Sequence, residues 1–131
     1  MDYLLKKFLP RIEFDSYEDF KANYTVNVPE NFNFGFDVVD AWAEEEPEKK
    51  ALVWCDEEDN EKIFTFTDIK RLSNKAANFF KSLGVKKGSV VMLILRRRWE
   101  YWICATALHK LGACLLYTSG DLRRGEYLHA K

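Results

Sequence analysis

The stretch from Ile63 to Gly112, IFTFTDIKRLSNKAANFFKSLGVKKGSVVMLILRRRWEYWICATALHKLG, decides the fold of this chain. Apolar residues in it first alternate, then recur every three or four positions, and later run together without interruption. These patterns are typical of strand, helix, strand and helix in turn. We expect strands at Ile63–Phe66 and Val90–Leu95 and helices at Asp68–Leu83 and Trp99–Leu111. Such alternation favours an α/β fold with right-handed crossovers between parallel strands.

The helix predicted at Asp68–Leu83 has start and stop signals. The hydroxyl of Thr67 is a suitable N-cap acceptor, and Asp68 places negative charge at the positive end of the helix dipole. Gly84 provides the left-handed residue at which helices commonly end. The expected core-facing stripe consists of Ile69, Leu72, Ala76, Phe80 and Leu83.

The run Val90–Leu95 is apolar throughout, which predicts a parallel strand covered on both faces. We expect it to pair in parallel with Ile63–Phe66 or with Ala51–Cys55. The polar residues 56–61 separate Ala51–Cys55 from Lys62–Phe66 and predict a hairpin with a longer loop. The expected core is therefore a partial mixed or parallel sheet with flanking helices.

Residues 1–30 form an N-terminal helical extension in this interpretation. A short helix at Asp2–Leu9 ends before Pro10, and Ser16 can cap a second helix at Tyr17–Tyr24. A third helix, at Phe36–Glu46, opens the main domain. Its expected inner face consists of Val38, Val39, Trp42 and Ala43.

Two runs, FTFTDIKRLSNKAANFFKSLGVKKGSVVMLIL and RRRWEYWICATALHKLGA, carry a family resemblance. They resemble the N-terminal region of AMP-forming acyl-CoA synthetases, in particular the acetate-like and medium-chain types of the adenylate-forming superfamily. The similarity extends back to about Asn31. Ser89 is a departure, since the family commonly has Asp there. The resemblance implies that residues 31–113 are the N-terminal part of the AMP-binding large domain.

Residues 114–131 fit the family less well, and we interpret them as an atypical tail from a frameshift or a junction. Tyr117-Thr118-Ser119-Gly120 looks like the opening of the family's phosphate loop, but the Gly and Lys that complete that loop are missing. Thr118, Ser119 and Gly120 are therefore weak candidates for nucleotide binding. The sequence offers no catalytic residue and no metal ligand.

The resemblance implies that the parent protein joins a small carboxylic acid to CoA with ATP and Mg²⁺, releasing AMP and pyrophosphate. Because the groups that stabilise such a transition state are missing, we expect this chain alone to be a non-catalytic N-terminal fragment without a cofactor. Two alternatives stay open. The chain could be a standalone α/β binding module, or a fragment of another adenylation enzyme such as a carrier-protein ligase.

Two clusters near the second predicted helix have both a functional and a structural interpretation. Arg96, Arg97 and Arg98 follow a strand, where doubly wound sheets bind ligands, and could meet a phosphate of ATP or CoA. A solvated connection is the favoured interpretation, since no Gly-rich cradle accompanies them. The aromatic residues at 99, 101 and 102 are interpreted mainly as core and packing surface rather than as an acyl pocket.

Composition narrows the class of protein further. With 47% hydrophobic and 15% aromatic residues, the 131-residue chain is not disordered. A net charge of −1 does not favour nucleic acid as a partner. No apolar run approaches the ~20 residues of a membrane span. The cysteines at 55, 104 and 114 lack metal-site spacing, and we interpret them as reduced and mostly buried, which predicts a cytoplasmic protein.

Overall fold

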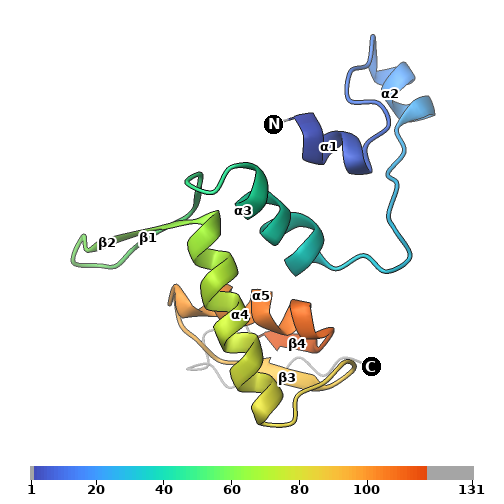
Figure 1. Ribbon diagram of the computed structural model, residues 1–131. Coiled ribbons are helices and arrows are strands. Elements are labelled where there is room, and N and C mark those ends of the chain that lie inside the picture. Colours follow the sequence, from blue (N-terminus) through green and yellow to red (C-terminus); the bar gives the residue numbers. More distant parts are fainter. Residues whose placement is uncertain (1, 118–131) are drawn as a thin grey trace, which may run out of the picture.

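A computed structural model of the chain describes residues 2–117, with side chains from Leu4 to Leu116 (Figure 1). The elements follow in the order α1 (Asp2–Phe8), α2 (Tyr17–Asn23), the π-helix η1 (Gly35–Asp40), α3 (Ala41–Glu45), β1 (Lys50–Cys55), β2 (Glu61–Thr65), α4 (Phe66–Ser82), β3 (Val90–Leu93), α5 (Glu100–Leu111) and β4 (Cys114–Tyr117). The α/β class is confirmed: small sheets are flanked by helices.

The strands of the described part form two separate pairs. β1 and β2 are the expected antiparallel hairpin, in which Val53 lies opposite Ile63. β3 pairs in parallel with β4, from Val90 opposite Cys114 to Leu93 opposite Tyr117. The prediction that β3 pairs with one of the hairpin strands is therefore wrong. The crossover through α5 instead places β4 beside β3. β4 lies in residues 114–131, the segment that the sequence analysis assigned to the tail.

The N-terminus of α4 is two residues earlier than predicted, because Thr65 and not Thr67 is the N-cap. The Thr65 hydroxyl accepts from the backbone N–H of Asp68 at 3.2 Å, and the Asp68 carboxylate accepts from the backbone N–H of Thr65 at 3.2 Å. This reciprocal capping box satisfies two donors at once, which Thr67 cannot do. At the other end Gly84 has a φ of 88°, as expected.

The buried face of α4 runs through Ile69, Ser73 and Ala77. Ile69 packs with Val39 of η1 and Ile103 of α5 in a small hydrophobic core. Leu83, placed on the stripe by the sequence pattern, is 65% exposed and does not belong to the core. It is the C-cap residue of α4.

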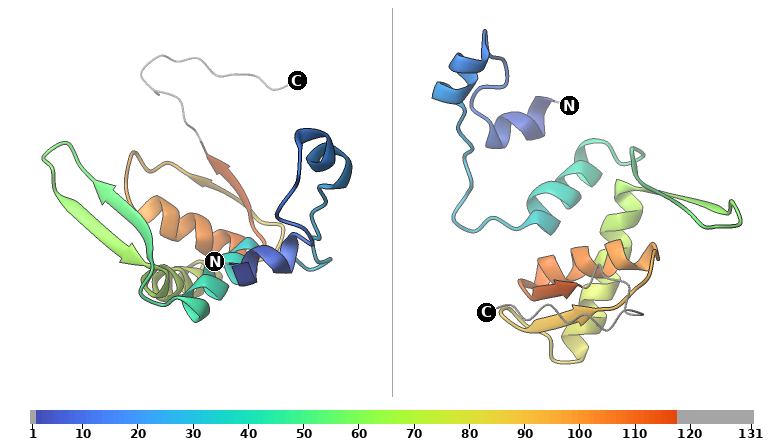
Figure 2. Two further views of the ribbon diagram at one scale, coloured as in Figure 1. Left: turned by 90° about the horizontal axis from the view of Figure 1, so that it is seen from above. Right: turned by 180° about the vertical axis from the view of Figure 1, so that it is seen from behind.

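α5 packs on one face of the β3–β4 sheet, and α4 packs against α5 (Figure 2). The other face of the sheet is open: Val90 is 64% exposed, Met92 55% and Leu116 46%. The prediction that β3 is covered on both faces is wrong for the described residues. An apolar run of this kind indicates that both faces of the strand are suited to burial. Among the described residues, only the face packed against α5 is covered.

The two N-terminal helices lie at the opposite end of the molecule from β3 and β4 (Figures 1 and 2). The Ser16 hydroxyl caps α2 as predicted, by accepting from the backbone N–H of Asp19 at 3.1 Å. α1 touches the body through Leu4, which is 5% exposed. The third predicted helix is present but divided, since its first turn, Gly35–Asp40, is a π-helix.

Two of the three cysteines contradict the expected burial. Cys55 and Cys114 are exposed, and Cys104 is half-buried. Among residues 2–117, no helix combines the length and apolar character needed to cross a membrane.

Candidate functional site

The carboxyl edge of the β3–β4 sheet is the candidate site. Leu93 and Tyr117 are register partners at the ends of the two strands. The connection after β3 and the sequence after β4 therefore leave the sheet at the same edge. In open α/β sheets this is the edge at which ligands bind.

The nucleotide-binding candidates Thr118, Ser119 and Gly120 follow β4 directly in the sequence. They lie outside the described residues, so their role stays a prediction. What the structure supplies is the strand that leads to them, with β3 hydrogen-bonded alongside it.

The arginine cluster lies in the connection after β3. Arg96, Arg97 and Arg98 are all exposed. The ion pair between Arg97 and Glu57, at 3.5 Å, joins side chains that are 91% and 88% exposed, so it contributes little to stability. These features agree with the favoured interpretation of a solvated connection.

The backbone of this connection is nevertheless held in place by the β1–β2 hairpin. Arg97 has a φ of 43°, a left-handed conformation that is uncommon for a residue other than Gly. Its carbonyl oxygen accepts a hydrogen bond from Trp54 Nε1 at 2.6 Å. Next to it, the ring of Trp99 lies 4.9 Å from that of Phe64. The hairpin thus supports the loop at the candidate edge.

Glu100 and Cys104 lie one turn apart at the start of α5. The Oε2 atom of Glu100 is buried and has no hydrogen-bond partner within residues 2–117. Burial, and secondly the nearby Glu100 carboxylate, raise the pKa of the Cys104 thiol. A raised pKa favours the unreactive thiol over the thiolate, which argues against a nucleophilic role for Cys104.

The outer side of α5 has a shallow, mostly apolar hollow beside β4, with a volume of about 270 Å³. Tyr101 and Trp102, which meet edge to face with ring centres 5.3 Å apart, belong to its lining. The other lining residues are Phe34, Ala105, Thr106, His109 and Leu115. The aromatic cluster is therefore divided: Trp99 packs inward on the hairpin, whereas Tyr101 and Trp102 line a surface.

A comparison with protein families decides the affiliation of the chain. The family described as AMP-binding enzyme matches residues 39–130. The chain belongs to the AMP-binding enzyme family. The matched part of the chain runs from the end of η1 through both sheets and includes the sequence after β4. The segment set apart as a tail lies inside the match, and the domain boundary placed at residue 113 stays a prediction.

The curated relatives that the chain matches include acyl-CoA synthetases. The chain is 30% identical over 122 residues to "Acyl-coenzyme A synthetase ACSM3, mitochondrial" of Homo sapiens. The aligned region covers 88% of this chain and 21% of that protein. The chain is 35% identical over 95 residues to the corresponding ACSM5 protein of Rattus norvegicus, covering 68% of this chain and 16% of the relative. The chain thus spans about a fifth or less of the length of these relatives.

Solved structures show the same fold. A fatty acyl CoA synthetase of Mycobacterium tuberculosis superposes with a TM-score of 0.60 at 24% identity, over 66% of this chain and 16% of that one. The N-terminal domain of FACL13 from the same organism superposes with a TM-score of 0.58 at 25% identity, over 66% of this chain and 21% of that one. The fold of the chain is that of the N-terminal part of adenylate-forming enzymes.

The predicted cytoplasmic localisation is wrong by this comparison, because the curated relatives named above are mitochondrial proteins. The prediction depended on three reduced, buried cysteines. A mitochondrial protein can contain reduced cysteines as well, so that observation did not separate the two compartments.

Two residues near the candidate edge were missed by sequence reasoning. Trp54 was read only as part of a strand, although an indole N–H in a hairpin usually finds an acceptor. Nothing in the sequence signals that one carboxylate oxygen of Glu100 is buried. No group of three or more His, Cys, Asp or Glu side chains is arranged to hold a metal ion within residues 2–117.

Proposed function

We propose that this chain is the N-terminal scaffold of an ATP-dependent acyl-CoA synthetase, and that it does not catalyse the reaction alone. The parent protein would convert a small carboxylic acid, ATP and CoA into acyl-CoA, AMP and pyrophosphate. The observation that carries the proposal is the family match over residues 39–130 together with the acyl-CoA synthetases among the relatives.

The expected contribution of this chain is positional. β3 and β4 end at one edge and would form one wall of the nucleotide site, with Thr118, Ser119 and Gly120 as candidate contacts. Formation of an acyl adenylate needs charged groups around the triphosphate and the developing negative charge. In this proposal the ATP, Mg²⁺ and CoA of the parent enzyme are bound mainly by parts of the longer protein.

Another adenylation enzyme, such as a carrier-protein ligase, is the second candidate. The fold does not separate it from an acyl-CoA synthetase, since the artificially fused adenylation-PCP di-domain from Klebsiella oxytoca superposes with a TM-score of 0.58. That similarity is 21% in sequence and supports the fold alone. Because the curated relatives are named as acyl-CoA synthetases, CoA is the preferred acceptor.

The test uses the proposed parent protein, of which this chain would be the N-terminal part. The purified protein is assayed for carboxylate-dependent exchange of pyrophosphate into ATP, and then for acyl transfer to CoA. We expect both activities with a carboxylate among acetate, butyrate and octanoate. Exchange without transfer to CoA would favour the carrier-protein alternative, and absence of exchange with every acid would contradict the proposed function.

A further inference from the structure

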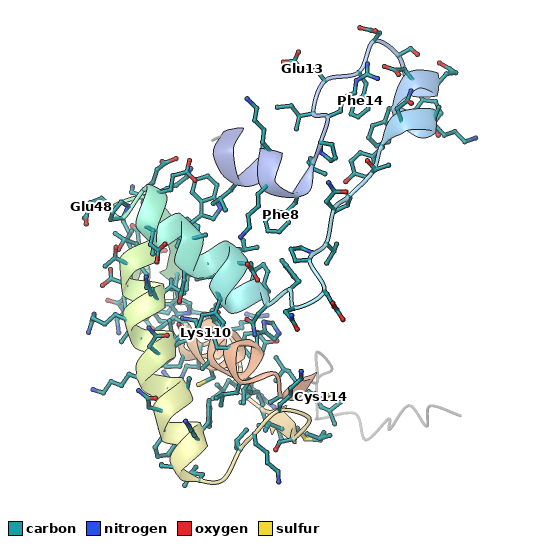
Figure 3. All side chains as sticks on the ribbon, turned by 45° about the vertical axis from the view of Figure 1, so that its right-hand side comes forward. Phe8, Glu13, Phe14, Glu48, Lys110 and Cys114 are labelled. Atoms are coloured by element: carbon teal, nitrogen blue, oxygen red, sulfur yellow. The ribbon has the colours of Figure 1, made fainter. Side chains whose placement is uncertain are left out.

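Lys110, near the end of α5, is a lysine in the interior of the protein (Figure 3). Its side chain is 2% exposed, and Nζ donates to Asp40 Oδ1 at 2.6 Å and to Asn74 Oδ1 at 2.7 Å. The ammonium also lies 5.4 Å from the centre of the Phe36 ring. Burying a charge costs several kcal/mol unless good partners compensate it. Here the partners are Asp40 of η1 and Asn74 of α4, so the ammonium group of Lys110 connects α5 to two other helices.

The approach of η1 to α5 is close enough to require a glycine. A Cβ atom on Gly35 would lie 2.5 Å from Lys110 Cγ and 3.3 Å from the carbonyl oxygen of Thr106. The stem of Lys110 therefore passes directly over the first residue of η1. No larger residue fits at position 35 without displacing the lysine that holds Asp40.

Asn33 makes a second connection at the same place. Its side-chain Nδ2 donates to the carbonyl oxygen of His109 at 2.8 Å, and its Oδ1 accepts from the backbone N–H of Gly35 at 3.0 Å. One side chain thus joins a carbonyl in the last turn of α5, which also accepts from the backbone N–H of Gly112, to a backbone N–H in the first turn of η1. We call residues 33–45, which comprise this contact, η1 and α3, the strap.

A second carboxylate of η1 faces a different neighbour. Asp37 accepts from Lys7 Nζ of α1 at 3.0 Å and from the backbone N–H of Asn33 at 2.8 Å. The Asp37 side chain is 26% exposed and that of Lys7 40%, against 11% for Asp40. η1 therefore carries an outer ion pair that holds α1 and an inner one that holds the strap to α5.

We propose that the Lys110–Asp40 pair is an orientation latch, which fixes the strap in one rotation and register against α4 and α5. Apolar contacts such as those of Val39 with Ile69 and Ile103 are non-directional, so alone they tolerate several arrangements. A buried ion pair permits essentially one geometry, because any other leaves a charge unpaired. The inner pair determines the position of η1 and α3 against α5, and the outer pair holds α1 against η1. This latch does not depend on the proposed function.

The test measures amide hydrogen exchange by mass spectrometry on the full chain and three variants. Asp40→Asn breaks the inner pair, and Asp37→Asn is the matched control, since it makes the same chemical change on the same π-helix. Asp40→Leu combined with Lys110→Met replaces the inner pair by apolar side chains. Peptides from the strap are compared with peptides from the centre of α5, around residue 107, and from α1.

For Asp40→Asn we expect exchange in the strap to accelerate by at least about tenfold more than in the centre of α5, because an unpaired buried charge opens the strap locally. Asp37→Asn should accelerate exchange in α1 and at Asn33, whose backbone N–H donates to Asp37, but not in the rest of the strap. The double variant should keep protection in the centre of α5 while the strap exchanges faster, since packing is kept and orientation is lost.

Equal acceleration in the strap and in α5 for Asp40→Asn would contradict the latch, because the pair would then contribute only to global stability. Strap protection equal to the unmodified chain in the double variant would contradict it as well. If the double variant does not fold, the comparison of Asp40→Asn with Asp37→Asn decides: indistinguishable strap exchange in the two variants would overturn the proposal.

Discussion

The indole nitrogen of Trp54 donates a hydrogen bond to the carbonyl oxygen of Arg97, 2.6 Å away and 43 residues along the chain. This bond connects β1 to the connection after β3, where Arg97 has a left-handed backbone conformation. A residue other than Gly keeps such a conformation only where its surroundings hold it. The hairpin therefore helps to shape the edge of the sheet at which we expect the nucleotide.

Trp54→Phe removes the donor and keeps an aromatic ring on β1. We expect a loss of about 0.5–1 kcal/mol in the free energy of unfolding, since the released carbonyl can turn to water. Urea unfolding followed by circular dichroism measures this. The control is Trp102→Phe, at a residue that is 55% exposed on α5, which should cost less. Equal losses would mean that the Trp54 bond contributes nothing of its own.

Ile69→Val tests the assignment of the buried face of α4. Ile69 is 6% exposed and packs against Val39 and Ile103, so removing one methyl should cost about 0.5–1.5 kcal/mol. The same change at Ile63 on β2, which is 46% exposed, should be close to neutral. Urea midpoints of the two variants give the comparison. A larger effect at Ile63 than at Ile69 would show that the core is placed wrongly.

The capping box predicts an acid-dependent part of the stability. The backbone N–H of Thr65, and then its hydroxyl and Arg71, hold the pKa of Asp68 below its usual value against the opposing effect of burial. The folded chain thus binds this proton less readily than the unfolded chain. The contribution is complete above the unfolded pKa of about 3.9 and is lost as pH falls through the lower folded pKa.

Asp68→Asn should therefore reduce the loss of stability below about pH 4, as measured by urea midpoints at a series of pH values. Thr65→Ala, which removes the hydroxyl of the cap together with the γ-methyl group, should cost about 0.5–2 kcal/mol at neutral pH. A pH profile unchanged by Asp68→Asn would show that the depressed pKa of Asp68 does not contribute to folding.

The open face of the β3–β4 sheet predicts that the chain associates with itself. Val90, Met92 and Leu116 are between 46% and 64% exposed on neighbouring strands, and an apolar sheet face promotes aggregation. Met92→Lys should lower light scattering of the isolated chain at a given concentration. Lys62→Met, which adds an apolar residue on the hairpin instead, is the opposite control. Light scattering that Met92→Lys does not change would show that the chain self-associates through another surface.

Local patterns in the sequence predict most of the elements correctly. The repeat through Ile69 identifies α4, Ser16 identifies the cap of α2, and Gly84 identifies the end of α4, because each depends on residues within one or two turns. The error at Thr65 has the same local origin. Two threonines are both possible caps, and only the position of Asp68 three residues after Thr65 selects the first.

Relationships over long distances were not predictable in this way. The partner of β3 was assigned to the hairpin because β4 was read as part of the tail. Lys110 and Asp40 are 70 residues apart, and a lysine in the last turn of a largely apolar helix does not indicate which residue it pairs with. At the candidate site, the strand leading to Thr118 is described, whereas the role of the residues that follow remains a prediction from the family resemblance.

The most direct test of the central claim is the release of pyrophosphate from ATP by the purified 131-residue chain, with Mg²⁺, with and without CoA, and with acetate, butyrate and octanoate in turn. As a scaffold without the groups that stabilise the transition state, the chain should release no pyrophosphate above a control without protein. Turnover above that control, abolished by Ser119→Ala or Gly120→Ala, would contradict the account and show that a working phosphate loop begins at Thr118.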